Sequence, residues 1–269
     1  MLTLNQYDDL TTAIHRIADE EILTRFRRLT TTDIIEKHPG DLVTTADRRA
    51  EERLTETLQK ALPGSLTVGE EATDADPAIV DHLHADTPVW IIDPVDGTSN
   101  FVNGDPYYSC LVSLAHKGQT IASWIYAPSL PLTAGALNGH GAWINNKPAT
   151  LVNRPYHGTW DVVTTHHNYT AGYHTVLNGL RHPHIHTTDC KSAGLSYLDL
   201  IAGKHHALVY TWEKPWDHAA GLHIHTTLGG TNTTMDGTPF SITGANTLPF
   251  ITGTPDAINA LTPLLAPQT

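Results

Sequence analysis

One twelve-residue segment constrains this chain more than any other: residues 90–101 read Trp-Ile-Ile-Asp-Pro-Val-Asp-Gly-Thr-Ser-Asn-Phe. The wholly apolar run Val89–Ile92 is typical of a buried strand, and it ends directly at Asp93. Pro94 then turns the chain and brings Asp96 back beside Asp93. Two carboxylates held this close repel each other unless a cation joins them. The segment therefore indicates either a cation site or, as the alternative, a turn with solvated aspartates.

The residues that follow this acidic turn indicate an anion site. Gly97 permits a tight backbone, and Thr98 or Ser99 can cap the start of a helix. The N-terminus of a helix presents unpaired N–H groups and the positive end of the helix dipole, which attract anions. Carboxylates beside an anion site suggest a divalent cation that bridges the protein and a phosphate.

Three further segments place acids at the ends of predicted elements. Asp41 and Asp47 precede or begin the second predicted helix, within Asp-Leu-Val-Thr-Thr-Ala-Asp. Glu70 and Glu71 close a Gly-Glu-Glu triplet after a short strand, and Asp217 lies in Trp-Asp-His-Ala-Ala-Gly at the start of a late helix. Taken singly, each segment has an ordinary explanation as a helix cap, a first-turn acid or a solvated turn.

The composition narrows the class of protein. With 269 residues, 40% hydrophobic and 16% charged, the chain suits one large globular domain or two fused halves. Its formal net charge of −12 argues against nucleic acid as a partner, because phosphate backbones attract lysine and arginine. The sequence has no run of about 18 apolar residues and no signal-peptide pattern at its start, so we expect no membrane partner. Cys110 and Cys190 cannot build a disulfide framework, which predicts a reducing compartment, the cytoplasm.

Hydrophobic periodicity predicts strands and helices that alternate along the chain. Strands are predicted at 66–68, 89–92, 110–115, 120–126, 132–137, 142–144, 161–165, 207–210 and 250–252. Helices are predicted at 46–61, 192–202, 217–228 and 256–265, after a first helix that carries Tyr7, Leu10, Ile14 and Ile17. The polar stretch near Arg154 is the best internal boundary, which gives halves at residues 1–152 and 153–269.

Together and in this order, the four acidic segments resemble the signatures of the inositol monophosphatase family of magnesium-dependent, lithium-sensitive phosphatases. Those signatures are Asp-x-Val-Thr-x-x-Asp, Gly-Glu-Glu, the core Trp-[Ile/Val]-[Ile/Val]-Asp-Pro-[Ile/Leu]-Asp-Gly-Thr-x-Asn-Phe and a late Trp-Asp-x-Ala-Ala-Gly. The chain departs from the core at Val95, a conservative change. The resemblance implies an α+β fold, a layered α-β-α-β-α sandwich like that of fructose-1,6-bisphosphatase. It also implies a homodimer, with each active site between the two halves of a subunit.

The resemblance further implies a metal-binding set. Glu70, Asp93 and the carbonyl oxygen of Val95 would hold one Mg²⁺, and Asp93, Asp96 and Asp217 would hold a second. A weaker third Mg²⁺ would lie near Glu70, which gives two to three ions per subunit, and Mn²⁺ is expected to substitute. A metal ion lowers the pKa of a bound water and neutralises charge on the leaving group.

The catalytic set implied by the resemblance is Asp47, Thr98 and Glu70. Asp47 and Thr98 would form the pair that orients and deprotonates the attacking water. Backbone N–H groups of Gly97 and Thr98 would hold the phosphate, and Asp96 would lie beside the substrate. The reaction would be an in-line attack on a phosphate monoester, without a covalent phosphoenzyme.

The residues expected to contact the rest of the substrate are Lys191, Ser192, Ala193 and Tyr210. The family has Gly-[Ser/Thr]-Ala where this chain has Lys191, Ser192 and Ala193. Tyr210 stands at the position of the family's inositol-binding glutamate, and Glu213 lies closer to the Trp-Asp motif. These differences weaken the case for inositol 1-phosphate, and Lys191 could either meet a second negative charge on the substrate or pair with a surface acid.

We therefore expect a magnesium-dependent phosphomonoesterase for a small polyol or sugar phosphate, with inositol 1-phosphate as the first candidate. The alternatives are a histidinol-phosphate phosphatase or another sugar bisphosphatase. A hypothesis of a different class is a catalytically silent, metal-dependent binding protein.

Eighteen histidines invite a metal-ligand interpretation. His182, His184 and His186 alternate, as residues on one face of a strand do, and His218 and His225 lie about two turns apart on the late helix. Adjacent pairs also occur at 166–167 and 205–206. None of these accompanies a zinc-site pattern, so we expect surface or packed histidines rather than a metal site.

Overall fold

Two β-sheets, separated by helices, form the framework of the protein. The computed structural model describes residues 2–38, 41–165 and 172–265. In this part of the chain, a seven-stranded sheet has the order β3-β4-β5-β6-β7-β8-β9 and a five-stranded sheet has the order β11-β10-β12-β14-β13. Strands β1 and β2 pair only with each other, as a separate antiparallel hairpin in the described residues.

The strands are β1 Ile34–His38, β2 Asp41–Thr44, β3 Leu66–Gly69, β4 Val89–Asp96, β5 Ser109–His116, β6 Gln119–Ala127, β7 Leu132–Leu137, β8 Gly141–Ile144, β9 Lys147–Pro148, β10 Trp160–Thr164, β11 Ile185–Asp189, β12 Ala207–Tyr210, β13 Thr231–Thr234 and β14 Phe250–Gly253. The α-helices are α1 Leu4–Glu21, α2 Thr45–Ala61, α3 Glu70–Ala75, α4 Thr98–Val102, α5 His174–Leu177, α6 Ala193–Ile201, α7 Pro215–Thr227 and α8 Pro255–Leu265.

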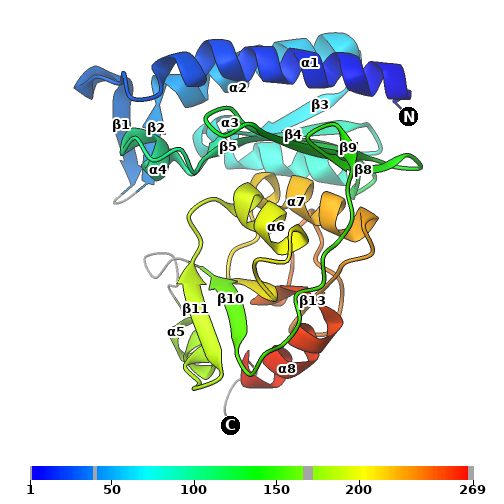
Figure 1. Ribbon diagram of the computed structural model, residues 1–269. Coiled ribbons are helices and arrows are strands. Elements are labelled where there is room, and N and C mark those ends of the chain that lie inside the picture. Colours follow the sequence, from blue (N-terminus) through cyan, green and yellow to red (C-terminus); the bar gives the residue numbers. More distant parts are fainter. Residues whose placement is uncertain (1, 39–40, 166–171, 266–269) are drawn as a thin grey trace.

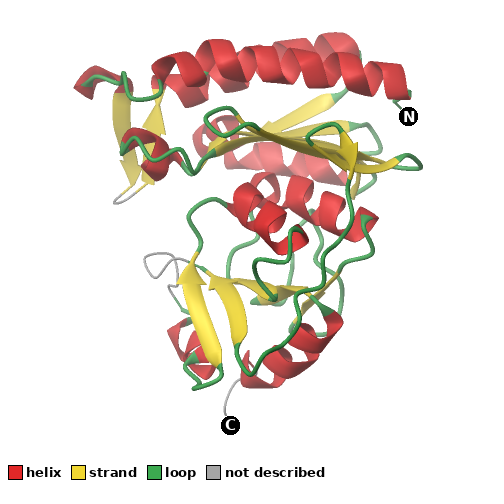
Figure 2. Ribbon diagram, in the orientation of Figure 1, coloured by secondary structure: helices red, strands yellow, loops and turns green. Residues whose placement is uncertain are grey.

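Layers of helix and strand alternate from one side of the molecule to the other (Figure 1). Helices α1 and α2 cover the outer face of the seven-stranded sheet, and α6 and α7 lie between the two sheets. Helices α5 and α8 lie on the far side of the five-stranded sheet (Figure 2). This arrangement is the predicted α-β-α-β-α sandwich of the α+β class, and that prediction is confirmed.

Local sequence signals explain why the outer helices begin where they do. Helix α1 starts after Thr3 because Thr3 and Gln6 form a capping box, and its buried stripe includes Tyr7 and Ile14. Helix α2 starts after Thr44 in the same way, with Asp47 as the reciprocal partner. Their apolar faces pack on the seven-stranded sheet and so fix the position of the residues at the start of α2.

Strand β4 carries the acidic turn into the core of the protein. All eight of its residues are buried, with β3 running parallel on one side and β5 antiparallel on the other. The strand extends to Asp96 rather than ending at Ile92, because Asp96 pairs again with Ser109 of β5 beyond an irregularity in the ladder. Asp93 and Asp96 are thereby held in a sheet rather than in a free turn.

Helix α7 contacts both sheets and is buried along most of its length. His223 Nδ1 lies 2.8 Å from Ser123 Oγ of β6, and His225 Nδ1 lies 3.1 Å from Thr252 Oγ1 of β14. Helix α7 therefore links the two sheets and carries Asp217 in its first turn.

The apolar pattern does not predict β1, β2, β9, β11, β13, α3 and α5. The helix start expected at Thr98 or Ser99 is that of α4, but its N-cap residue is Gly97, with no side-chain cap. Strand β13 reads Thr-Asn-Thr-Thr and β11 is mostly exposed, so neither shows alternation of apolar residues. Of His182, His184 and His186, only His186 lies in a strand. The histidines at 166–167 lie outside the described residues.

The connection between β9 and β10 contains the predicted boundary between residues 1–152 and 153–269, and this division stays a prediction. Within residues 2–38, 41–165 and 172–265, no helix has both the length and the apolar character that crossing a membrane requires.

Candidate active site

Three carboxylates from separate elements approach one another at the junction of the two halves. Asp93 lies on β4, Glu70 begins α3 directly after the parallel strand β3, and Asp217 lies in the first turn of α7. Gly69 pairs with Ile92, so the carboxyl ends of β3 and β4 deliver Glu70 and Asp93 to the same edge of the sheet. The sequence prediction that these acids converge agrees with this placement.

The electrostatics of the three acids show how close the charges are. Burial raises the pKa of Asp93 well above its usual range, and the negative charges of Glu70, Asp96 and Asp217 raise it further. Burial and the charge of Asp217 likewise raise the pKa of Glu70. For Asp217, burial and the charge of Asp96 raise the pKa to about 6. Each of these carboxylates would be more readily ionised beside a cation.

One atom, Oδ1 of Asp93, shows that this site suits a cation. Asp93 is 2% exposed, and its Oδ1 atom is buried without a hydrogen-bond partner among the described residues. An unpaired buried carboxylate oxygen costs free energy that a bound cation would remove. Oxygen donors alone suit a hard ion such as Mg²⁺. In the described residues, however, no group of three or more His, Cys, Asp or Glu side chains is arranged so that it could hold a metal ion.

Asp96 turns toward helix α6 and accepts four hydrogen bonds, three from the start of α6 and one from Ser109 of β5. Its Oδ1 accepts from the backbone N–H of Ala193 at 2.9 Å, and its Oδ2 accepts from that of Gly194 at 2.8 Å. The hydroxyl groups of Ser192 and Ser109 donate to Oδ2 at 2.5 and 3.1 Å. Asp96 therefore satisfies the first turn of α6 from the other half of the molecule, and the predicted contact residues Ser192 and Ala193 are brought to it.

Asp47 and Thr98 meet as the sequence predicts. The Thr98 hydroxyl lies 3.2 Å from Asp47 Oδ1 and 2.9 Å from the carbonyl oxygen of Val95, and its single proton serves one of them at a time. Asp47 Oδ2 accepts from the backbone N–H and the hydroxyl of Thr44 at 2.9 and 2.5 Å. Asp47 is fully buried, and this burial raises its pKa, which favours a role as proton acceptor.

Gly97 makes the close approach of three segments possible. Its φ of +96° lies in the left-handed region, and a Cβ atom there would lie 3.1 Å from the carbonyl oxygen of Lys191 and 3.2 Å from that of Tyr107. The Asn100 side chain donates to the same two carbonyl groups, at 2.8 and 2.7 Å. The Lys191 side chain itself is 61% exposed, and its Nζ lies 3.8 Å from Asp105.

Comparison with known proteins agrees with this geometry. The family model described as "Inositol monophosphatase family" matches residues 4–263. The chain belongs to the inositol monophosphatase family. An inositol-1-monophosphatase of Mesorhizobium japonicum is 31% identical over 205 residues, which cover 75% of each chain. A putative Nus factor SuhB of Neisseria meningitidis is 32% identical over 206 residues, 74% of this chain and 75% of the relative.

A solved structure described as an IMPase/NADP phosphatase complexed with Mg²⁺ and phosphate shares the fold. Its TM-score is 0.80 at 22% identity, and the alignment covers 99% of this chain and 97% of that one. The prediction of a phosphoric monoester hydrolase of the inositol monophosphatase family is confirmed at the level of the family.

In this family member, the side chain of Tyr210 is placed away from solvent. Tyr210 is 0% exposed, its ring stacks on His218 at 5.3 Å between ring centres, and its hydroxyl lies 3.5 Å from Cys190 Sγ. Its role as a substrate contact stays a prediction, and its burial counts against it. Glu213 is engaged elsewhere, because its Oε2 accepts from the backbone and side-chain N–H groups of Asn246 at 3.0 and 2.8 Å.

Three residues near the acids were not found from the sequence. Lys37 of β1 places its Nζ 3.2 Å from Glu71 and 3.7 Å from Glu70. Burial raises the pKa of Glu71 to about 7, and Lys37 opposes that rise. Glu51 of α2 accepts the backbone N–H groups of Glu71 and Ala72, both at 2.8 Å, and thereby caps α3. The third residue, Trp212, donates its indole N–H to Asp217.

One sequence signal could have indicated Glu51: it lies four residues after Asp47, on the same face of the helix. Lys37 carries no such signal, because β1 itself was not predicted.

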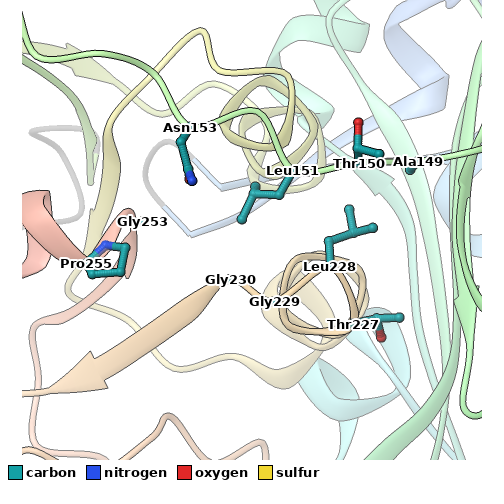
Figure 3. A pocket seen from close by; sticks show the side chains of 10 residues that line it. All are labelled: Ala149, Thr150, Leu151, Asn153, Thr227, Leu228, Gly229, Gly230, Gly253 and Pro255. Carbon is teal, nitrogen blue, oxygen red and sulfur yellow. The ribbon is translucent and has the colours of Figure 1, made fainter.

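A separate cavity of about 470 Å³ lies at the opposite end of α7 from Asp217 (Figure 3). Its lining comes from the connection after β9, the end of α7 and the turn between β14 and α8. The lining residues are Ala149, Thr150, Leu151, Asn153, Thr227, Leu228, Gly229, Gly230, Gly253 and Pro255. None of them is charged, so this cavity does not offer the chemistry that the acidic site offers.

Proposed function

We propose that the protein is a Mg²⁺-dependent phosphomonoesterase that hydrolyses a small polyol or sugar phosphate. The observation that carries the proposal is the unpaired Asp93 Oδ1, which lies among Glu70 and Asp217. The Asp47–Thr98 pair lies close by on the chain that follows β4. A structural neighbour bound to Mg²⁺ and phosphate supports the same chemistry for this fold.

The ions would be held by the acids that repel one another without them. Glu70, Asp93 and the carbonyl oxygen of Val95 would hold one Mg²⁺, and Asp93, Asp96 and Asp217 a second, with a third, weaker ion near Glu70. Bound Mg²⁺ supplies charge neutralisation for the phosphate and lowers the pKa of water. Asp96 Oδ1 accepts only one of the four hydrogen bonds described above, so it is the atom of this carboxylate with room for an ion.

The chain's own residues would then orient the ester and move the proton. Backbone N–H groups of Gly97 and Thr98 would hold the phosphate oxygens. Water would bond to phosphorus as the ester P–O bond breaks, with its proton passing to Thr98 Oγ1 while the Thr98 proton passes to Asp47 Oδ1. The leaving alcohol oxygen takes its proton from solvent.

Three kinds of phosphate ester are candidates for the substrate. Inositol 1-phosphate remains the first candidate, because the Mesorhizobium japonicum relative carries that name. Tyr210 is buried and Glu213 is bound to Asn246, so neither offers a carboxylate to polyol hydroxyl groups. Exposed Lys191 favours an ester with a second anionic group, such as a sugar bisphosphate. Histidinol phosphate is the remaining alternative.

Phosphate release from a panel of esters, with and without Mg²⁺, tests this function. Inositol 1-phosphate, histidinol phosphate and fructose 1,6-bisphosphate would form the panel, and the rate should require Mg²⁺ for at least one of them. Asp93→Asn should abolish release, whereas Asp86→Asn, which changes an acid that is 94% exposed, should leave it intact. Full turnover by the Asp93 variant would contradict the assignment.

A metal-dependent binding protein without catalysis is the second candidate. The altered contact region around Tyr210 favours it, and one relative carries the name of a putative Nus factor rather than of a phosphatase. In this case Mg²⁺ would bind but no ester of the panel would release phosphate. The homodimer, the cytoplasmic location, lithium sensitivity and replacement of Mg²⁺ by Mn²⁺ stay predictions.

A further inference from the structure

The side chain of Trp212 reaches back to the candidate metal site from the loop between β12 and α7. Its indole N–H donates to Asp217 Oδ2 at 2.5 Å. Trp212 is only partly buried, and its ring lies against Tyr210 at 4.3 Å between ring centres. The carboxylate of Asp217 is thus held by a side chain that lies five residues earlier in the chain.

We propose that Trp212 is a positioning residue for cation binding: its indole N–H fixes the Asp217 carboxylate so that the other oxygen faces the ion. This inference rests on the metal site of the proposed function. Trp212 is not itself a ligand; it orients one. A hydrogen bond to an ionised acceptor is roughly twice as strong as one between neutral groups, which suits this role.

One further hydrogen bond holds the backbone of Trp212 through His218, and a second holds His218 in turn. The carbonyl oxygen of Trp212 lies 3.1 Å from His218 Nε2, which must therefore carry the proton and donate. The other ring nitrogen, Nδ1, then accepts from the Tyr197 hydroxyl at 3.2 Å. His218 is 0% exposed, so this arrangement is shielded from water. The chain of donors runs from Tyr197 through His218 to the Trp212 backbone, and from the Trp212 side chain to Asp217.

Both the backbone and the side chain of Trp212 are therefore held against the start of α7. The backbone of Trp212 is fixed to the first turn of α7 through His218, and its side chain is fixed to that turn through Asp217. An orienting partner of a metal ligand lowers the cost of ordering that ligand when the ion binds. Removing such a partner weakens metal affinity by about 10–100-fold in other proteins.

Calorimetric titration of the whole chain with Mg²⁺, without substrate, tests this inference. Trp212→Phe keeps an aromatic ring but removes the N–H, and Mg²⁺ should bind about tenfold or more weakly. Trp216→Phe is the matched control, because its indole Nε1 is buried with no hydrogen-bond partner in the described residues. The control should bind Mg²⁺ like the unaltered chain, although it lies next to Asp217.

A second variant, Trp212→His, retains a ring N–H and should bind Mg²⁺ more tightly than Trp212→Phe. Where Trp212→Phe does not fold, Trp212→Leu, which also lacks the N–H, takes its place in this comparison. In turnover assays, the Mg²⁺ concentration for half-maximal rate should rise in Trp212→Phe, while KM for the ester changes little. Equal Mg²⁺ affinity in Trp212→Phe and the unaltered chain overturns the inference alone. Equal weakening by Trp212→Phe and Trp216→Phe also overturns it, since loss of indole packing would explain both. Absence of Mg²⁺ binding by the unaltered chain overturns the proposed metal site, and the inference with it.

Discussion

At the scale of single residues, Gly97 sets how closely the acidic turn can approach the other half of the protein. Its φ is positive, and a Cβ atom there would crowd two carbonyl oxygens at 3.1 and 3.2 Å. Thr98 follows directly, so the position of its hydroxyl beside Asp47 depends on this backbone conformation. Glycine is thus favoured at position 97 both by the left-handed backbone conformation and by the closeness of the two carbonyl groups.

Gly97→Ala should destabilise the fold by about 1–2 kcal/mol from left-handed strain, and by more from the contacts at 3.1 and 3.2 Å. Gly139→Ala is the control, since Gly139 has a φ of +82° but no atom within 4 Å of the added Cβ. Urea unfolding of both variants measures the difference. Equal losses would mean that crowding against the carbonyl groups of Lys191 and Tyr107 contributes nothing.

At the scale of elements, α7 carries a candidate metal ligand in its first turn, while most of the helix is buried. Asp217 lies in its first turn, whereas His223 and His225 lie deep between the sheets. Both ring nitrogens of His223 have partners, Ser123 Oγ at 2.8 Å and Asn138 Oδ1 at 2.9 Å. Burial lowers the pKa of His223 to about 4, so the native protein keeps this ring neutral.

This burial predicts a loss of stability in mild acid. Between the pKa of about 6.5 in the unfolded chain and about 4 in the native protein, only the unfolded chain binds the proton. The free energy of unfolding therefore falls as pH falls through this window, by about 2 kcal/mol for His223 between pH 7 and pH 5. His223→Gln should remove that part of the pH dependence in urea unfolding at the two pH values.

His140→Gln makes the same substitution at an exposed position and should leave the pH dependence as it is. A His223→Gln variant that loses as much stability from pH 7 to pH 5 as the unaltered chain would refute the assignment of the effect to His223.

The elements that the sequence predicts are those with a buried face. Strand β4 and helices α1 and α2 show clear apolar patterns because each packs against the core. Strands β11 and β13 lack such patterns because threonine and exposed positions dominate them. The reach of β4 to Asp96 depends on pairing with β5, which the local sequence does not encode.

The candidate site follows the same division between local and distant information. Asp93, Asp96 and Thr98 lie within six residues, so their motif is readable along the chain. Lys37 meets Glu70 and Glu71 across more than thirty residues, and Glu51 meets Glu71 across twenty. Trp212 lies near Asp217 in sequence, but a tryptophan at this spacing does not by itself predict a hydrogen bond to a carboxylate. Such contacts are products of the fold and become visible only in three dimensions.

At the scale of the whole molecule, the acidic cluster concentrates negative charge in a chain whose net charge is already −12. Burial and mutual repulsion raise the pKa values of Asp93 and Glu70, so ionising them in the folded state costs stability. A cation that binds only the folded state should offset this cost.

Mg²⁺ should therefore raise the melting temperature. At one hundred times its dissociation constant, the added stability is about 2.7 kcal/mol, which corresponds to a rise of roughly 5–10 °C for a domain near this size. Asp93→Asn should show little rise with Mg²⁺, and without Mg²⁺ it should melt no lower than the unaltered chain because one repulsive charge is gone. NaCl at equal ionic strength controls for screening, and an equal rise with Mg²⁺ in both proteins would contradict a site built on Asp93.

The three hydrogen bonds between Asp96 and the start of α6 have a consequence for how the protein loses activity on heating. Asp96 joins β4 to the start of α6 and, in the proposed function, is also a metal ligand, so β4 and α6 cannot separate while the proposed site stays assembled. On heating, loosening of the contact between β4 and α6 should thus abolish turnover first, at temperatures where the chain is still folded. Inactivation and unfolding should then occur at different temperatures. The difference between these temperatures measures the strength of the contact between Asp96 and α6.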